Sequence, residues 1–240
     1  MAKEFTEVKD SGVRQEFATG SRRDTADGKG RYDLIPVHAL RMVAQGRFDL
    51  LPHHALFRLA RHYEHGSKKY GDHNWTKGQP LHRYLDSAIR HMYKVSEGLA
   101  DEDHAAAGTW NILAYIETDY RISIGVLPGE LYDLQPPILP ASGGNGSGNS
   151  WKINTSVHGR RPFDRTQRSM SMHLNEAIAY AHGVLENPED DSQAVESVWN
   201  MMAFIETEHL VSTGKLDKSF DDFSHRWQVE KSTPDIGDGV

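Results

Sequence analysis

Apolar residues recur along most of this 240-residue chain with the period of amphipathic helices. The pattern predicts helices over about 33–46, 52–66, 81–96, 103–122, 170–186 and 192–212. Asp33 can cap the first helix and Gly46 can close it, while Gly66 is expected to end the second. No segment shows a convincing two-residue alternation between hairpin signals. The chain is therefore expected to be all-α.

One stretch of this pattern occurs twice. Residues 84–127 and 173–216 align without a gap, and 16 of the 44 positions are identical. The strongest match joins Trp110–Thr118 to Trp199–Thr207. A pair of helices cannot bury its apolar stripe alone, so the two copies are expected to pack as an antiparallel helical bundle with pseudo-twofold symmetry and a degenerate second copy.

This repeat and the composition between its copies suggest five regions. They are a flexible arm at 1–30, a catalytic helical domain at 31–127, a Pro/Gly/Ser-rich connector at 128–165, a degenerate repeat at 166–227 that packs on the first unit, and a tail at 228–240.

Composition narrows the function classes. Cysteine is absent, which excludes disulfides and thiol chemistry. No apolar run has the length of a membrane span, no signal peptide is evident, and the expected location is the cytoplasm. The net charge of −7 argues against duplex nucleic acid as a partner. Basic residues crowd positions 58–94, which favours a local anionic ligand.

A polar ridge on the helix at 81–96 is the first candidate for chemistry. The second copy keeps most of the apolar stripe of this helix but replaces its polar residues Asp86, Arg90, His91 and Lys94 by Asn175, Ala179, Tyr180 and Gly183. Packing therefore does not require these four groups. The alternative is a solvated face with helical ion pairs such as Asp86 to Arg90.

Three polar residues are instead retained in the second copy. Glu97, Asp101 and Asn111 recur as Glu186, Asp190 and Asn200. Carboxylates from Glu64, Glu97 and Asp101 would suit a hard divalent cation such as Mg²⁺ or Mn²⁺. The structural alternative is that Asp101 and Asp190 cap helices and that the asparagine amide bridges helices. His104 lies seven residues before Asn111, hence on the same helix face, and becomes Gln193 in the copy.

A turn-rich stretch at 68–78 combines cations, an aromatic ring and an amide. Lys68 and Lys69 could hold phosphate, Trp75 could stack on a base, and Asn74 could read its edge. The alternative is a solvated lysine pair with a tryptophan plugging the end of the bundle. The second copy has no counterpart of this stretch.

The full motif string resembles a known phage family. Its parts are Arg31–Pro36, Lys68–Gly71, Asn74–Trp75, Arg90–His91, Gly98, Asp101–Asp103 and Trp110–Asn111. The string is similar to the dATP/dGTP diphosphohydrolases (MazZ type), which are related to the MazG-like all-α nucleotide pyrophosphatases. The resemblance covers about residues 28–120.

Membership would imply metal-dependent cleavage of a purine deoxynucleoside triphosphate to the monophosphate and pyrophosphate. In the family, this reaction serves phages that replace adenine by 2-aminoadenine, so the location would be the cytoplasm of a host cell. Mg²⁺ is the expected ion, with Mn²⁺ or Co²⁺ as alternatives. The Glu-x-x-Glu and Glu-x-x-Asp pattern of MazG-like proteins is not present literally, so Glu64, Glu97, Asp101 and Glu102 are expected to be the metal ligands.

The other roles follow from the same resemblance. Catalysis is assigned to Glu97, His91 and Asp101, and substrate binding to Lys68, Lys69, Asn74, Trp75, Arg90, Lys94, His104 and Asn111. Two other functions stay open: a non-catalytic nucleotide-binding protein and a helical interaction module of the same fold. A homo-oligomer is a further expectation.

Overall fold

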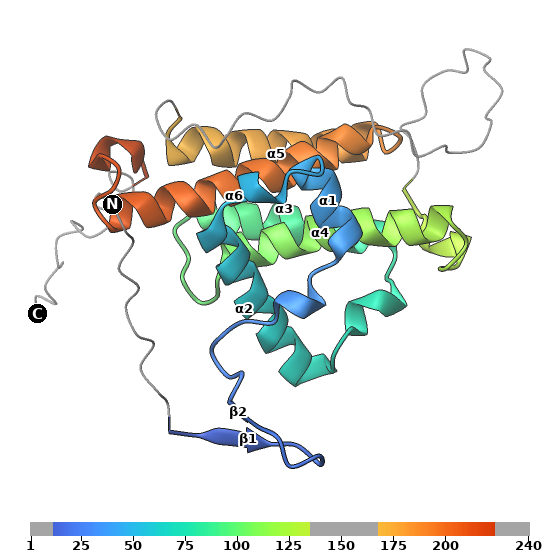
Figure 1. Cartoon of the computed structure of the whole chain (residues 1–240). Helices are drawn as coiled ribbons and strands as arrows, with labels where there is room; N and C mark the ends of the chain where they lie inside the picture. The colour runs from blue at the N-terminus through green and yellow to red at the C-terminus, as the bar shows by residue number, and fades with distance from the viewer. Residues whose placement is uncertain (1–11, 135–167, 224–240) are drawn as a thin grey trace, which may run out of the picture.

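The computed structural model describes residues 12–134 and 168–223, and these ranges are mostly helical (Figure 1). Six α-helices carry this part of the chain: α1 (Val37–Ala44), α2 (His53–Tyr70), α3 (Leu81–Ser96), α4 (His104–Ser123), α5 (Met170–Glu186) and α6 (Asp191–Ser212). Short 3-10 turns join or follow them: η1 (Tyr32–Leu34), η2 (Phe48–Leu50), η3 (Asn74–Lys77), η4 (Gly129–Leu131) and η5 (Lys218–Phe220). The predicted all-α class is confirmed.

The predicted ends of the first two helices are wrong in part. Gly66 does not end α2, which continues to Tyr70 and stops at Gly71, where φ is +87°. A glycine inside a helix costs about 1 kcal/mol, and the long apolar stripe of α2 offsets that cost. Asp33 does not cap α1, because Pro36 precedes the helix and the Asp33 carboxylate accepts hydrogen bonds from Arg31.

Part of the arm predicted at 1–30 has regular structure. Strands β1 (Arg14–Glu16) and β2 (Arg22–Asp24) pair antiparallel in a small exposed hairpin. An ion pair of 2.6 Å between Arg14 and Asp24 supports it. Two strands bury little surface, so the hairpin lies on the molecule without contributing to the core.

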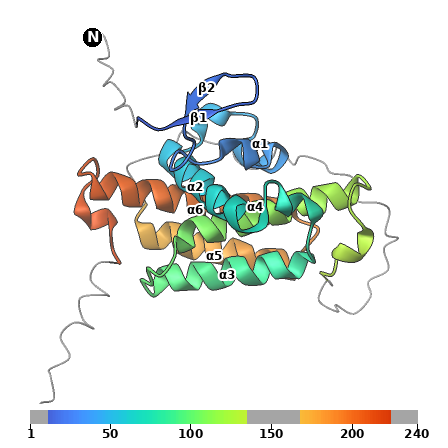
Figure 2. The same cartoon turned by 90° about the horizontal axis from the view of Figure 1, so that it is seen from below.

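The core of the molecule lies between two helical hairpins. α3 pairs with α4, and α5 pairs with α6; α3 also packs on α5, and α4 on α6 (Figures 1 and 2). The Tyr93 hydroxyl lies 3.4 Å from Nε2 of His182, its own aligned position in the second copy. Aligned residues meet in this way near a twofold axis. Common origin of the two hairpins stays a prediction.

A second, shorter repeat was missed in the sequence. Residues 30–44 and 46–60 align without a gap, with nine of fifteen positions identical. Arg31 binds Asp33 through Nε and Nη2 at 2.8 and 2.7 Å, and Arg47 binds Asp49 with the same atoms at the same distances. Each copy is a 3-10 turn, a proline and the start of a helix.

The two copies of this turn-and-helix motif dock in the same way. The backbone N–H of Ala39 in α1 donates to Glu117 of α4 at 3.4 Å, and the His38 ring stacks on Tyr120 with centroids 3.5 Å apart.

In the other copy, the N–H of His54 in α2 donates to Glu206 of α6 at 3.3 Å. The His54 ring stacks on His209 with centroids 3.8 Å apart. The first N–H groups of a helix have no partner within the helix, so a carboxylate that accepts from them stabilises the start of α1 and of α2. α1 therefore holds to the first hairpin as α2 holds to the second.

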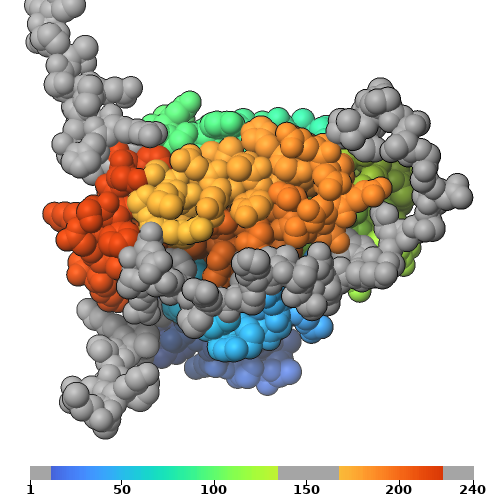
Figure 3. Space-filling model, turned by 90° about the horizontal axis from the view of Figure 1, so that it is seen from above, coloured from blue at the N-terminus to red at the C-terminus, as the bar shows by residue number. Residues whose placement is uncertain are grey.

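The C-terminal hairpin covers one face of the molecule, where α5 and α6 lie side by side in the view from above (Figure 3). Phe223, predicted to order the tail, is buried with its ring 6.1 Å from that of Phe204. Residues 135–165 of the predicted connector, Trp227 and the tail at 228–240 lie outside the described residues. Among the described helices, none has the length and apolar character needed to cross a membrane.

Candidate active site

A cavity of about 1070 Å³ opens between α2, the η3 turn and the facing sides of α3 and α4. One part of its lining is aromatic and apolar: Leu34, Tyr63, Trp75 and Trp110. Another part is charged or carries imidazole rings: Arg58, Arg61, His62, His65, Lys69, His91, Asp101, Glu102 and Asp103. An aromatic wall beside a polar wall suits a ligand with a flat ring and an anionic group.

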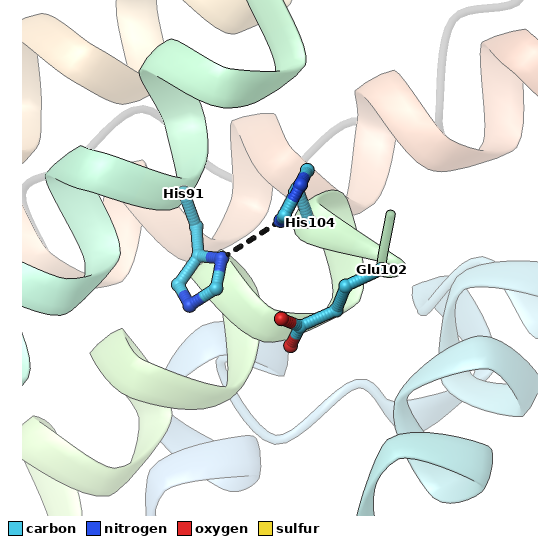
Figure 4. Close-up of side chains that lie close together, drawn as sticks. All are labelled: His91, Glu102 and His104. Carbon is cyan, nitrogen blue, oxygen red and sulfur yellow. Dashed lines mark hydrogen bonds between the residues drawn. The ribbon is translucent and has the colours of Figure 1, made fainter. Parts of the chain in front are cut away.

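Three side chains at this cavity form a candidate metal centre. His91 of α3, His104 of α4 and Glu102 just before α4 each offer a ligand atom, and the three atoms lie within 4.8 Å of one another. Figure 4 shows the three side chains converging from these separate elements. The Nδ1 atoms of the two imidazoles are 3.0 Å apart. Two nitrogens and a carboxylate oxygen are typical ligands of Mn²⁺, Fe²⁺, Co²⁺ or Zn²⁺.

Asp101 orients His104. Its Oδ1 lies 2.7 Å from Nε2 of His104, and the pKa of Asp101 is lowered mainly by this hydrogen bond. A proton on Nε2 leaves the lone pair of Nδ1 directed at His91 and the ligand point, as carboxylate–histidine pairs do in metal sites. Burial lowers the pKa of His91, which favours its neutral, ligand-ready form. Asp101, predicted as a ligand, thus contacts a ligand group.

Several residues predicted from sequence come together here. His91, Asp101, Glu102, Lys69, Asn74, Trp75 and Asn111 line the cavity, and His104 is buried directly behind it. Trp75 is half-buried, with the Arg121 guanidinium 5.0 Å from its ring centroid on one side. The Asn111 amide donates to the Ala107 carbonyl of its own helix at 2.9 Å.

Glu64 lies apart from the three ligand groups. It is 3 % exposed, and its two oxygens accept from the N–H groups of Gly28 and Gly30 at 2.9 and 3.0 Å. Arg61 and Lys68 also donate to it. Burial alone would raise the pKa of Glu64, but these donors lower it to about 2. The carboxylate is saturated with donors and fastens residues 28–30 to α2.

Apart from His91, the polar ridge of α3 lies away from the cavity. Arg90, Lys94 and Glu97 line a separate groove of about 700 Å³ beside His182 of α5. Arg90 binds Asp86 at 2.9 Å, the helical ion pair named as the alternative. Lys94 lies 3.5 Å from Asp101 and so neighbours the site from outside. Lys68, predicted to hold phosphate, binds Asp27 and Glu64.

Sequence reasoning missed the contribution of α2 to the cavity. Arg58, His62, His65 and Lys69 recur at intervals of four, three and four residues, which is the spacing of one helix face. This polar stripe lies opposite the apolar stripe of α2. Arg58, His62 and His65 lie within the predicted helix, so their spacing was visible in the sequence, and only Lys69 lies beyond Gly66.

The retained aspartates differ between the two hairpins. Asp190 caps α6 by accepting from the N–H of Ser192 at 3.0 Å. In the first hairpin, Asp103 caps α4 and Asp101 is left to bind His104. Helix capping therefore explains Asp190, while Asp101 contacts His104 of the candidate metal centre.

Comparison with known proteins gives one match. Residues 44–123 match the family model described as dATP/dGTP diphosphohydrolase, N-terminal. No curated protein and no solved structure matches the chain. The matched segment contains α2, η3, α3 and α4, and it includes every residue of the cavity lining except Leu34. Through these residues, the chain matches the dATP/dGTP diphosphohydrolase family, and the match supports an enzyme that hydrolyses a deoxynucleoside triphosphate.

Proposed function

We propose that this cavity binds a purine deoxynucleoside triphosphate and hydrolyses it, with a divalent metal ion, to the monophosphate and pyrophosphate. The observation that carries the proposal is the convergence of His91, Glu102 and His104 at a wall of the cavity within the family-matched segment. The resemblance to phage enzymes supports a role in remodelling the nucleotide pool for 2-aminoadenine DNA.

The reaction forms a bond from a water oxygen to the α-phosphorus and breaks the bond from that phosphorus to the bridging oxygen. Pyrophosphate leaves, and the water gives up a proton. A bound divalent ion would neutralise the phosphate oxygens and lower the pKa of the water. Mn²⁺ or Co²⁺ suits the two imidazoles better than Mg²⁺, which prefers oxygen ligands.

The remaining groups have roles that follow from their places. Lys69 on the last turn of α2 is a cation at the cavity that could bind the phosphates. Its ammonium lies 4.9 Å from the centroid of the Tyr70 ring. Trp75 and Asn74 line the cavity and would bind the base, Trp75 by stacking and Asn74 by hydrogen bonds. Trp110 and Tyr63 complete an apolar wall. Asp101 holds His104 in the tautomer that can bind metal.

The test is to incubate the full chain with each dNTP and with Mn²⁺, Co²⁺ or Mg²⁺, and then to separate the products. Monophosphate and pyrophosphate from dATP or dGTP support the proposal. Triphosphate that is bound but not consumed supports a non-catalytic nucleotide-binding protein, and absence of binding supports an interaction module.

A matched variant comes from the second hairpin. Gln193 occupies the position of His104 there, so His104→Gln is compatible with this helix packing. The variant should lose turnover and metal affinity while it keeps its melting temperature within a few degrees.

A further inference from the structure

Arg58 of α2 stands where the cavity meets the C-terminal half. Its Nε and Nη2 donate to the two carboxylate oxygens of Asp103 at 2.8 and 2.6 Å. Its Nη1 donates to Glu208 of α6. Paired bonds from one planar guanidinium fix orientation as well as distance. One side chain of the cavity lining therefore joins α2, the start of α4 and α6.

Asp103 determines where α4 begins. Its Oδ1 accepts from the N–H of Ala106 at 3.0 Å, and its carbonyl accepts from Ala107 at 2.9 Å. The residues on either side of it are Glu102 and His104, two of the three metal-ligating groups. Whatever holds Asp103 therefore also holds these two groups relative to His91.

The repeated motif supplies an internal comparison for this bridge. α1 docks on α4 as α2 docks on α6. In the contact of α1 with α4, however, the residues that align with Arg58, Asp103 and Glu208 are Met42, Ser192 and Asp119. Docking therefore does not need an arginine bridge. The bridge from Glu208 through Arg58 to Asp103 occurs where α2 docks on α6, beside the cavity.

The geometry assigns Glu208 a positioning role: through Arg58 and Asp103 it holds the first turn of α4, and with it Glu102 and His104, in the arrangement that binds metal. This inference rests on the proposed function, because the groups that it positions are the ligands of that function. The C-terminal half thereby completes a site whose ligands all come from the first half.

The test compares Glu208→Gln and Arg58→Met with two controls, Glu186→Gln on α5 and Arg41→Met on α1. Each control removes the same charge from an exposed position. Met42 of α1 aligns with Arg58 of α2, so a methionine at position 58 is expected to be compatible with the fold. Amide hydrogen exchange, Mn²⁺ affinity, melting temperature and kcat are measured on the full chain.

The expected result is faster exchange at Ala106 and Ala107 and a loss of about tenfold in Mn²⁺ affinity and in kcat. The controls should match the unaltered chain, and all melting temperatures should agree within a few degrees. Unchanged exchange and unchanged Mn²⁺ affinity in Glu208→Gln would overturn the inference. Exchange and Mn²⁺ binding do not need turnover, so a chain that hydrolyses no dNTP contradicts the proposed function and still leaves this result decisive.

Discussion

Two imidazole nitrogens and one carboxylate meet beside the start of α4, and this donor set changes the ion that is expected. A set of four carboxylates, as predicted from sequence, favours Mg²⁺. Two of these four carboxylates lie apart from the three ligand groups. Glu64 accepts hydrogen bonds from backbone N–H groups and from two cations, and Glu97 lines the outer groove. Sequence spacing alone could not separate Glu97, Asp101 and Glu102, since all three lie at the end of α3 or just before α4.

The two neighbouring lysines of α2 should differ in function. Lys69→Ala removes a cation from the cavity and should raise the KM for dATP or dGTP about tenfold, the effect of losing one charged contact worth about 1.5 kcal/mol. Lys68→Ala removes a cation that already binds Asp27 and Glu64, and it serves as the matched control. Steady-state kinetics measure both. Equal KM values for the two variants would remove Lys69 from the phosphate site.

Among the elements, the turn-and-helix motif provides a second matched pair. Gly30 and Gly46 have φ values of +77° and +76°, where a residue with a Cβ is strained. A Cβ on Gly30 would lie 2.8 Å from the Cβ of Ala60, whereas nothing lies within 4 Å of a Cβ on Gly46.

Gly46→Ala should therefore cost about 1–2 kcal/mol from backbone strain alone, and Gly30→Ala should cost more because the chain must also move off α2. Chemical denaturation gives both free energies of unfolding. If Gly46→Ala proves equally or more destabilising, the close approach of residue 30 to α2 is not important.

The α4–α6 contact contains an acid pair whose behaviour depends on pH. Burial, and then the neighbouring Asp191, raise the pKa of Asp119 to about 7 from the ordinary aspartate value of 3.8, which applies to the unfolded chain. Folded protein then holds a proton that unfolded protein releases, so stability falls as pH rises from about 4 to about 7 and stays at its lower level above.

Asp119→Asn should remove the part of this dependence that comes from Asp119. A smaller part should stay, because burial and then Asp190 raise the pKa of Asp191 to about 6. Above pH 7, the variant should be more stable than the unaltered chain by at least about 1 kcal/mol, a rise of a few degrees in melting temperature. The advantage should shrink as the pH approaches 4. Thermal unfolding measured across this range checks the sign, and an advantage that grows at low pH would contradict it.

At the scale of the molecule, local patterns predicted the helices better than the site. α3 and α5 have the predicted bounds because each has a clear apolar stripe between strong breakers. The predicted α2 is too short because glycine is a common helix terminator, and Gly66 lies inside the helix instead.

The site itself depends on contacts that sequence does not encode locally. His91 and His104 meet only because α3 and α4 pack together as a hairpin. Arg90 and Lys94 share a helix with His91 but lie on its outer face, against α5. Comparison with the second copy identified polar residues of α3 that packing does not need. It could not show which of them face the cavity, as His91 does, and which face the outer groove, as Arg90 and Lys94 do.

The proposed function assigns the site to the first half of the described residues and a supporting role to the second hairpin. The second hairpin carries Tyr180, Asp191 and Gln193 where the first carries His91, Glu102 and His104. Helix α1, which docks on α4 as α2 docks on α6, ends at Ala44 and so has no counterpart of the stripe that α2 extends to Lys69. Among the described residues, these two differences leave the second hairpin without a counterpart of the candidate site.

We propose that metal-dependent hydrolysis takes place at His91, Glu102 and His104. The most direct test is the rate of monophosphate and pyrophosphate formation from dATP and dGTP with Mn²⁺, compared between Glu102→Gln and Glu97→Gln. Both variants remove one carboxylate from an exposed residue. The predicted result is a loss of at least about a hundredfold in Glu102→Gln, with Glu97→Gln close to the unaltered chain. Full turnover in Glu102→Gln, or its loss in Glu97→Gln alone, would contradict the account.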